Sequence, residues 1–307
     1  MNKSLIADIS LLLVVFVWGS TFVVVQDAIE FLTPHSFNAI RFFIAFLVLL
    51  CIYILFNKKE KEHFHFSTIK SGALIGFWLF LGYAFQTLGL VYTTPAKAGF
   101  ITGLSVVLVP LLSFVLLKQK LNRNMIFGII FATVGLYMIT MLQASTFGKG
   151  DFFVLLGAIS FAMHIITTGR FAKHFHAMPL TIIQIFTVSL LSFICSLILE
   201  NPKQMYQLEV LLKEEVIIGL LITAIFATAL AFLAQTYFQA YTTATRVALI
   251  FAMEPVFAAV ASYILIGETF TISMIIGCIL ILAGIILAEW PSKAVRNLEK
   301  RSLKKIS

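Results

Sequence analysis

A glutamate inside an apolar stretch is the residue of this sequence with the clearest potential for chemistry. Glu254 lies about ten residues into the run 245–266, roughly 15 Å along a helix and so near the middle of a bilayer. A carboxyl group at that depth is costly and indicates a function, such as binding and releasing a proton. Pro255 follows it and removes one backbone hydrogen bond. The alternative is a structural Glu254 that ties the kinked backbone or pairs with a neighbouring helix.

A histidine is the second candidate for proton chemistry. His164 shares one helical face of the run 151–169 with Ser160 and with Thr167 or Thr168. Imidazole titrates near neutral pH, which suits a proton relay or a substrate contact. A hydrogen-bonded core histidine is the structural alternative.

An arginine lies within the run 36–56. Arg41 follows Asn38 by one turn and is expected near the outer end of its helix. There it could attract a carboxylate in an outer vestibule. It could equally anchor the helix end or pair with Asp27 or Glu30.

Neutral polar and aromatic side chains recur at helical spacing in five runs. They are Trp18 and Thr21, Tyr83 and Gln86, Thr102 and Ser105, Gln184 with Thr187, and Phe232 and Gln235. Lipid-facing positions disfavour Gln, so these faces are expected to point into the bundle. Each residue alone is also compatible with hydrogen bonding between helices. We predict a substrate cavity lined by these residues, Thr187 apart, with Arg41 and His164, and possible proton coupling through Glu254 or His164.

Other chemistries find little support. His63 and His65, with Glu60 and Glu62, lie in a short lysine-rich loop, which we interpret as a solvated turn. The three cysteines, Cys51, Cys195 and Cys278, lie in different apolar runs, so we predict no disulfide, no metal site and no cofactor. A phosphate loop of the form G-x-x-x-x-G-K-[S/T] is missing, which disfavours an ATP-driven pump.

The elements that must position these residues are apolar helices. The 307 residues are 60% hydrophobic and 12% charged, with a mean hydropathy of +1.01, whereas a soluble domain is about a quarter charged. The apolar runs are 5–25, 36–56, 68–92, 96–117, 123–142, 151–169, 179–199, 215–241, 245–266 and 271–290. A spanning segment must satisfy its own backbone groups, so we predict an all-α membrane protein with ten transmembrane helices.

The basic residues indicate orientation. Most of the 22 Lys and Arg residues fall on the side of the amino terminus, which predicts that both termini are cytoplasmic. We therefore attribute the net charge of +8 to the basic loops that orient the chain in the membrane, and we expect no nucleic acid partner. A basic cytoplasmic tail, 291–307, suits anionic lipid headgroups.

The chain repeats itself at an offset of 149 residues. Gln86 then falls on Gln235, Lys97 on Arg246 and Gly135 on Gly284. We predict two five-helix repeats, 1–143 and 150–290. Because five is odd, the second repeat enters from the opposite side and is inverted, an arrangement suited to exposing a central site to each side in turn.

Several short segments match a known pattern in order and spacing. They are Trp18–Phe22, Pro34 followed by Arg41, Phe42 and Ala45, then Glu254–Phe257, Gly267–Glu268, Gly277 and Gly284. With them the sequence resembles the EamA-type, ten-helix members of the drug/metabolite transporter superfamily over nearly its whole length. Gln119 departs from Glu268 of the second repeat, so this loop acid has no symmetric role. The resemblance implies transport of small metabolites or drugs, often export of amino acids.

We therefore predict a secondary transporter, an exporter, of small metabolites such as amino acids or drug-like amines. It would work by alternating access around a midplane cavity, with or without proton coupling. Phosphorylated substrates are disfavoured, because the only clear midplane charge is acidic. We expect it in the plasma membrane, with a small-molecule substrate and the lipid bilayer as partners, and a monomer suffices. The alternative is a membrane-embedded enzyme or a sensor without transport activity.

Overall fold

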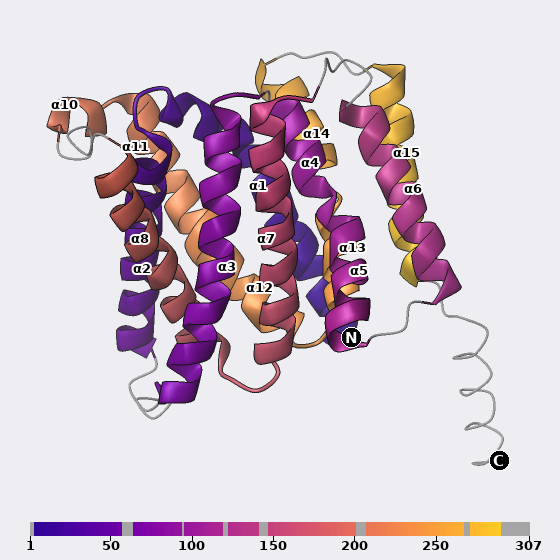
Figure 1. The fold of residues 1–307 in the computed structure, drawn as a ribbon, viewed down its shortest axis with the longest axis horizontal. Helices are drawn as coiled ribbons and strands as arrows, with labels where there is room; N and C mark the ends of the chain where they lie inside the picture. Colours follow the sequence, from indigo (N-terminus) through magenta and orange to yellow (C-terminus); the bar gives the residue numbers. More distant parts are fainter. Residues whose placement is uncertain are drawn as a thin grey trace.

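The chain folds into helices. The computed structural model describes residues 3–56, 64–93, 95–118, 122–140, 147–200, 207–266 and 271–289, and no strand occurs in those ranges. The helices of the first half are α1 (Lys3–Ile29), α2 (Pro34–Phe56), α3 (Phe66–Leu90), α4 (Pro95–Gly103), α5 (Ser105–Leu117) and α6 (Arg123–Thr140). The later elements are α7 (Lys149–Phe171), α8 (Ala177–Leu199), α10 (Leu208–Leu211), α11 (Glu214–Ala224), the π-helix η2 (Ile225–Leu230), α12 (Ala231–Gln239), α13 (Ala244–Phe251), α14 (Glu254–Ile266) and α15 (Ile272–Glu289). Figure 1 shows them as one upright bundle with α6 and α15 paired at an edge.

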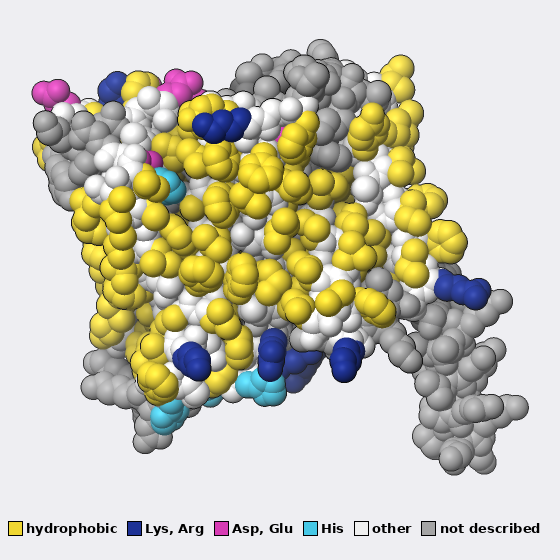
Figure 2. Space-filling view, in the orientation of Figure 1, with side chains coloured by type: hydrophobic (Ala, Val, Ile, Leu, Met, Phe, Trp, Pro, Cys, Tyr) yellow, Lys and Arg dark blue, Asp and Glu magenta, His cyan; other side chains and the backbone are white. Residues whose placement is uncertain are grey.

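The bundle is built to lie in a membrane. Six segments are long and apolar enough to cross one: Pro34–Phe56, Phe66–Leu90, Lys149–Phe171, Ala177–Leu199, Glu214–Gln239 and Ala244–Ala261. Four shorter apolar helices accompany them: Leu5–Thr21, Ile101–Leu116, Arg123–Met138 and Ile272–Ala288. Figure 2 shows hydrophobic side chains over the middle of the visible face. Such a surface is stable against lipid, because its side chains are apolar and most of the helical backbone groups are hydrogen-bonded within their helices.

The two ends of the bundle differ in charge. In Figure 2 most Lys and Arg side chains gather at one end, and the Asp and Glu side chains lie near the other. We call the end where α1 begins, with Lys70 and Arg170, the basic end. The opposite end, where α8 ends and α11 begins, carries Glu200, Glu209 and Glu214, and we call it the acidic end. The tail 291–307 and the loop residues Gln119 and Glu268 lie outside the described residues.

The helices recur in matched pairs along the chain. The bounds of α2 and α8 differ by 143 residues at both ends, and those of α5 and α14 differ by 149, as do those of α6 and α15. Five of the six additional residues fall in the longer connection between α8 and α11, which contains α10, and the sixth lies within Glu214–Gln239, which is one residue longer than α3. The same order of elements therefore occurs twice, with two offsets.

Two helices that the sequence predicted as continuous, 96–117 and 245–266, are each broken. The first divides into α4 and α5 at Leu104, and the second into α13 and α14 at Ala252 and Met253. At the breaks the backbone forms hydrogen bonds of the 3₁₀ type, from residue i to residue i−3. They run from Leu104 N to Ile101 O (3.2 Å) and from Met253 N to Ile250 O (3.0 Å). In the second case Pro255 explains the break, because it has no N–H to continue the ladder and fits only a first helical turn.

The paired helices α6 and α15 touch through glycines. A Cβ on Gly128 would lie 2.5 Å from the carbonyl oxygen of Gly284, and a Cβ on Gly284 would lie 2.6 Å from that of Gly128. This reciprocal contact brings the two backbones together, as small residues allow in lipid.

The largest buried apolar cluster surrounds α13, between the middle of the bundle and the basic end. It includes Leu11 and Val15 of α1, Val109 of α5, and Val247 and Ile250 of α13. These side chains are at most 1% exposed. The cluster fills the interior near the basic end. A site can therefore lie in the interior between this cluster and the acidic end.

Candidate functional site

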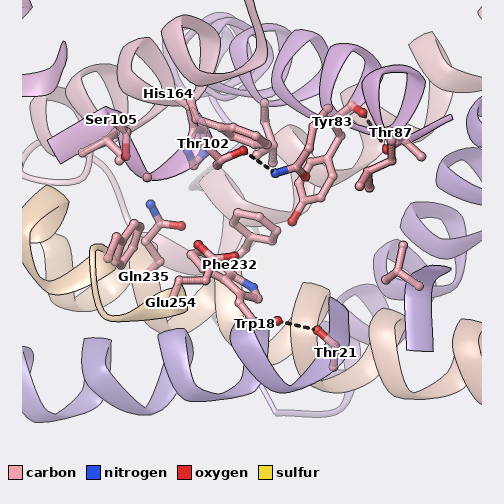
Figure 3. A pocket seen from close by; sticks show the side chains of 18 of the residues that line it. Trp18, Thr21, Tyr83, Thr87, Thr102, Ser105, His164, Phe232, Gln235 and Glu254 are labelled. Atoms are coloured by element: carbon pink, nitrogen blue, oxygen red, sulfur yellow. Dashed lines mark hydrogen bonds between the residues drawn. The ribbon is translucent and has the colours of Figure 1, made fainter. Parts of the chain in front are cut away.

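A cavity lies inside the bundle where α1, α3, α7 and α12 meet both broken helices (Figure 3). Its lining comprises Trp18, Thr21, Val25, Arg41, Leu79, Tyr83, Gln86, Thr87, Leu90, Thr102, Gly103, Ser105, Phe161, His164, Ile165, Phe232, Gln235, Phe251 and Glu254. These side chains come from both halves of the chain. They run from the middle of the bundle toward the acidic ends of α1 and α3.

All but one of the side chains predicted from the sequence line this cavity. The exception is Gln184, which is fully buried behind His164. Its amide is occupied, since Oε1 lies 3.2 Å from His164 Nε2 and Nε2 donates to Thr236 Oγ1 at 2.9 Å. Helical spacing placed Gln184 on an inward face but could not show that another side chain stands between it and the cavity.

The lining is arranged in pairs related by the two offsets. At 149 residues the pairs are Tyr83 and Phe232, Gln86 and Gln235, Thr102 and Phe251, and Ser105 and Glu254; at 143 residues they are Trp18 and Phe161, and Thr21 and His164. Phe161 and Phe251 were missed from the sequence. The second offset would have found Phe161 as the partner of Trp18, and the first would have found Phe251 as the partner of Thr102.

The helix breaks bring polar residues to the cavity. Ser105 is the first residue of α5 and Glu254 the first of α14, so each follows its break directly. Gly19 of α1 packs on the second break, where a Cβ would lie 2.6 Å from the Glu254 carbonyl oxygen. No described residue hydrogen-bonds or forms an ion pair with the Glu254 carboxylate, which faces the cavity (Figure 3). It is available to a ligand or a proton.

Arg41 adds a positive charge to the same cavity. Its side chain is only 4% exposed, and its Nε donates to Thr228 Oγ1 at 2.7 Å. Thr228 belongs to the π-helix η2, and the guanidinium carbon lies 5.0 Å from the centre of the Tyr83 ring. Arg41 begins about 10 Å inside its helix, at seven residues from Pro34. Arg41 therefore brings a buried cation to the same cavity that Glu254 lines.

Aromatic rings form the walls between these charges. Trp18 lies with its ring centre 5.3 Å from that of Phe232 and 5.1 Å from that of Phe251. Tyr83 makes an edge contact with Phe161 at 5.3 Å. The Trp18 indole N–H donates to the Ala227 carbonyl at 2.8 Å, again in η2. These contacts fix an apolar, aromatic surface that suits a ligand with an apolar part.

The cavity also contains amide groups held in place by hydrogen bonds. Gln86 Nε2 donates to Thr102 Oγ1 at 2.9 Å, and Gln235 Nε2 lies 3.2 Å from Gln239 Oε1. The amide oxygen of Gln184 faces His164, so Nε2 of the ring carries the hydrogen in this arrangement. Among the described residues there is no group of three or more metal-ligating side chains. The cavity offers binding groups of both charges, amides and aromatic walls.

Comparisons with known proteins identify what this architecture belongs to. The model of the EamA-like transporter family matches the chain twice, at residues 5–141 and 148–290. An uncharacterized transporter of Archaeoglobus fulgidus is 35% identical over 287 residues, covering 94% of this chain and 87% of that protein. A probable amino-acid metabolite efflux pump of Salmonella typhimurium is 25% identical over 286 residues, covering 89% of this chain and 91% of that protein.

A solved crystal structure has the same fold. It superposes with a TM-score of 0.78 at 17% sequence identity, over 95% of this chain and 97% of the other. The family and the names of the relatives point to transport and not to an enzyme, and the apolar helices make the chain a multi-pass membrane protein. With the family model matching both halves, the chain belongs to the EamA-like transporter family.

Proposed function

We propose that this protein is a secondary transporter that exports amino acids by alternating access around the cavity. One observation carries the choice of substrate: Arg41 and Glu254 line a single cavity from different helices. A free amino acid carries a carboxylate and an ammonium group, so it can satisfy both side chains. The Salmonella relative named as an amino-acid metabolite efflux pump supports the same substrate class.

Drug-like amines are the second candidate. The aromatic walls and the Glu254 carboxylate would suit a cationic amine. Such a solute would leave Arg41 without a partner and would be repelled by it, which makes amino acids the better fit. Phosphorylated solutes fit Arg41, but their charge is repelled by an ionised Glu254.

The proposed mechanism requires two inverted repeats, 1–143 and 150–290, with ten spans. The recurring helix bounds and the breaks at Leu104 and Met253, 149 residues apart, support it. Broken helices at the centre of inverted repeats are typical of transporter binding sites. We place the basic end in the cytoplasm, following the bias of Lys and Arg. A plasma-membrane location and a monomer as the working unit complete the proposal.

Proton coupling is assigned to Glu254, with His164 as the second candidate. Both side chains line the cavity, so a substrate and a proton could compete for the same carboxylate. A neutral glutamine at position 254 would keep the shape of the side chain and lose its charge.

The test is uptake of a radiolabelled amino-acid panel into proteoliposomes, with and without a proton gradient, for the wild-type protein and Glu254→Gln. Accumulation driven by the gradient in the wild type only is the expected result, with downhill exchange retained in the variant at a higher KM, because the neutral amide holds the ammonium group less strongly. Asp27→Asn removes an exposed acid from α1 and serves as the control. Equilibration that ignores the gradient would make the protein a facilitator. If the protein moves no amino acid but does move amines, the substrate assignment is wrong.

A further inference from the structure

The cavity extends toward one end of the bundle only. Arg41 and Val25 line it toward the acidic end, whereas their partners at the 143-residue offset, Gln184 and Thr168, are completely buried toward the basic end. At the 149-residue offset, Thr87 of the lining corresponds to Thr236, which is not among the residues that line the cavity. We call the part of the substrate path between the cavity and one end of the bundle a half-path. The half-path toward the acidic end is open, and the corresponding half-path toward the basic end is closed.

The closed half is rich in polar groups that a permanent core would not contain. Leu90 at the open end corresponds to Gln239, which is 0% exposed and donates from Nε2 to the carbonyl of Ile165. The hydroxyl groups of Thr168, Ser113 and Thr242 are buried and make no hydrogen bond to any described residue. A buried hydroxyl without a partner costs free energy, and such groups are rare in a core that stays closed. Exposure to water in another conformation would satisfy them.

An ion pair holds this half together at the basic end. Arg246 Nη2 of α13 lies 2.9 Å from Asp8 Oδ2 of α1, and Asp8 is 6% exposed. The pair joins two of the helices that contribute side chains to the large apolar cluster. The same two positions recur at the acidic end, since Asp8 corresponds to Asp151 at the 143-residue offset and Arg246 to Lys97 at the 149-residue offset. An acidic and a basic residue therefore occur at corresponding sequence positions in both halves.

We propose that Gln184, Thr236, Gln239 and Thr168 line a second half of the substrate path, which is closed here and latched by Asp8 and Arg246. When the latch opens, α1 and α13 separate at the basic end and these side chains meet the solute. The second half-path is neutral, because Gln184 occupies the position that Arg41 holds in the first. These four side chains bind polar solutes through amides and hydroxyls. This inference rests on the proposed transport by alternating access.

Thiol labelling tests the latch directly. The native cysteines Cys51, Cys195 and Cys278 are first replaced by alanine, and a single cysteine is placed at Thr168 or at Val25. Rates of modification by a small charged maleimide are then measured on the purified full-length protein. With the latch intact, we expect fast labelling at Val25 and slow labelling at Thr168. Asp8→Asn is expected to speed labelling at Thr168 about tenfold or more, because it removes the negative charge that pairs with Arg246 and so weakens the link between α1 and α13.

Labelling at Val25 should fall as labelling at Thr168 rises, since one conformation replaces the other. The charge swap Asp8→Arg with Arg246→Asp should restore the original rates, and Asp27→Asn on the same helix should leave them unchanged. Slow labelling at Thr168 in folded Asp8→Asn protein would overturn the proposal. So would labelling that rises at both positions, which indicates general loosening. Because labelling needs no transported solute, a failed substrate assignment and a failed latch give different results.

Discussion

Gly19 should be the least replaceable glycine beside the cavity, because α1 crosses the helix break there in direct contact. A Cβ at this position would lie 2.6 Å from the Glu254 carbonyl oxygen and 2.8 Å from Phe257 Cβ. Ordinary contact begins at 3.4 Å, so Gly19→Ala requires α1 and α14 to separate by about 0.8 Å, the difference between 3.4 and 2.6 Å. Overpacking of this kind costs about 1–3 kcal/mol.

Gly99→Ala is the matched control, since it lies on the broken helix α4 and a Cβ there would meet nothing within 4 Å. Alanine also favours helix over glycine by about 0.5–1 kcal/mol, so Gly99→Ala should be neutral or stabilising. The assay is thermal unfolding of both variants in detergent, followed by uptake into proteoliposomes. We expect Gly19→Ala to unfold at a lower temperature and to transport more slowly, because Glu254 is displaced. If Gly19→Ala unfolds at the same temperature as the wild type, α1 does not contact the helix break this closely.

Three further substitutions test separate parts of the structure. Arg41→Gln should raise the KM for an amino acid about tenfold to a hundredfold, since a hydrogen bond to a charged group contributes about 1.5–3 kcal/mol. The KM for the corresponding amino-acid amide should change little. Equal effects on the two KM values would contradict a contact between Arg41 and the carboxylate. Glu200→Ala should lower stability by about 1–3 kcal/mol in denaturant titrations with the KM unchanged, because Glu200 accepts hydrogen bonds from His35 N at 2.7 Å and from Ser36 N at 3.0 Å at the start of α2. Trp18→Phe should cost about 1 kcal/mol by the same measurement, because it removes the donor to the Ala227 carbonyl; a larger loss in uptake than in stability would place the indole in substrate binding.

Much of the cavity lining follows from helical spacing. Gln86 lies three residues after Tyr83, and Gln235 lies three residues after Phe232, so each pair shares a face of its helix. Glutamine is disfavoured against lipid, which directs these faces inward. The structure places all four side chains around one cavity. Here the local pattern suffices, because a polar helix face surrounded by lipid is stable only when it faces the interior of the bundle.

Other features depend on contacts that no local pattern contains. The break at Leu104 has no proline at the site of the missing hydrogen bond, unlike the break before Pro255. The π-helix η2, which presents Thr228 to Arg41, occurs in an ordinary apolar run. Gln184 has the spacing of a cavity residue but bonds to Thr236 behind His164. Each of these is decided by a partner far away in the sequence.

The two halves share a backbone plan but divide the chemistry between them. The cation of the cavity, Arg41, comes from the first half, where the second half has the neutral Gln184. The anion, Glu254, comes from the second half, where the first has the neutral Ser105. A fully symmetric chain would bring two arginines or two glutamates to the centre, and like charges at that depth repel strongly. The difference between the halves therefore gives one cavity two opposite charges, and the likeness of their helices is what the proposed opening of the two ends in turn requires.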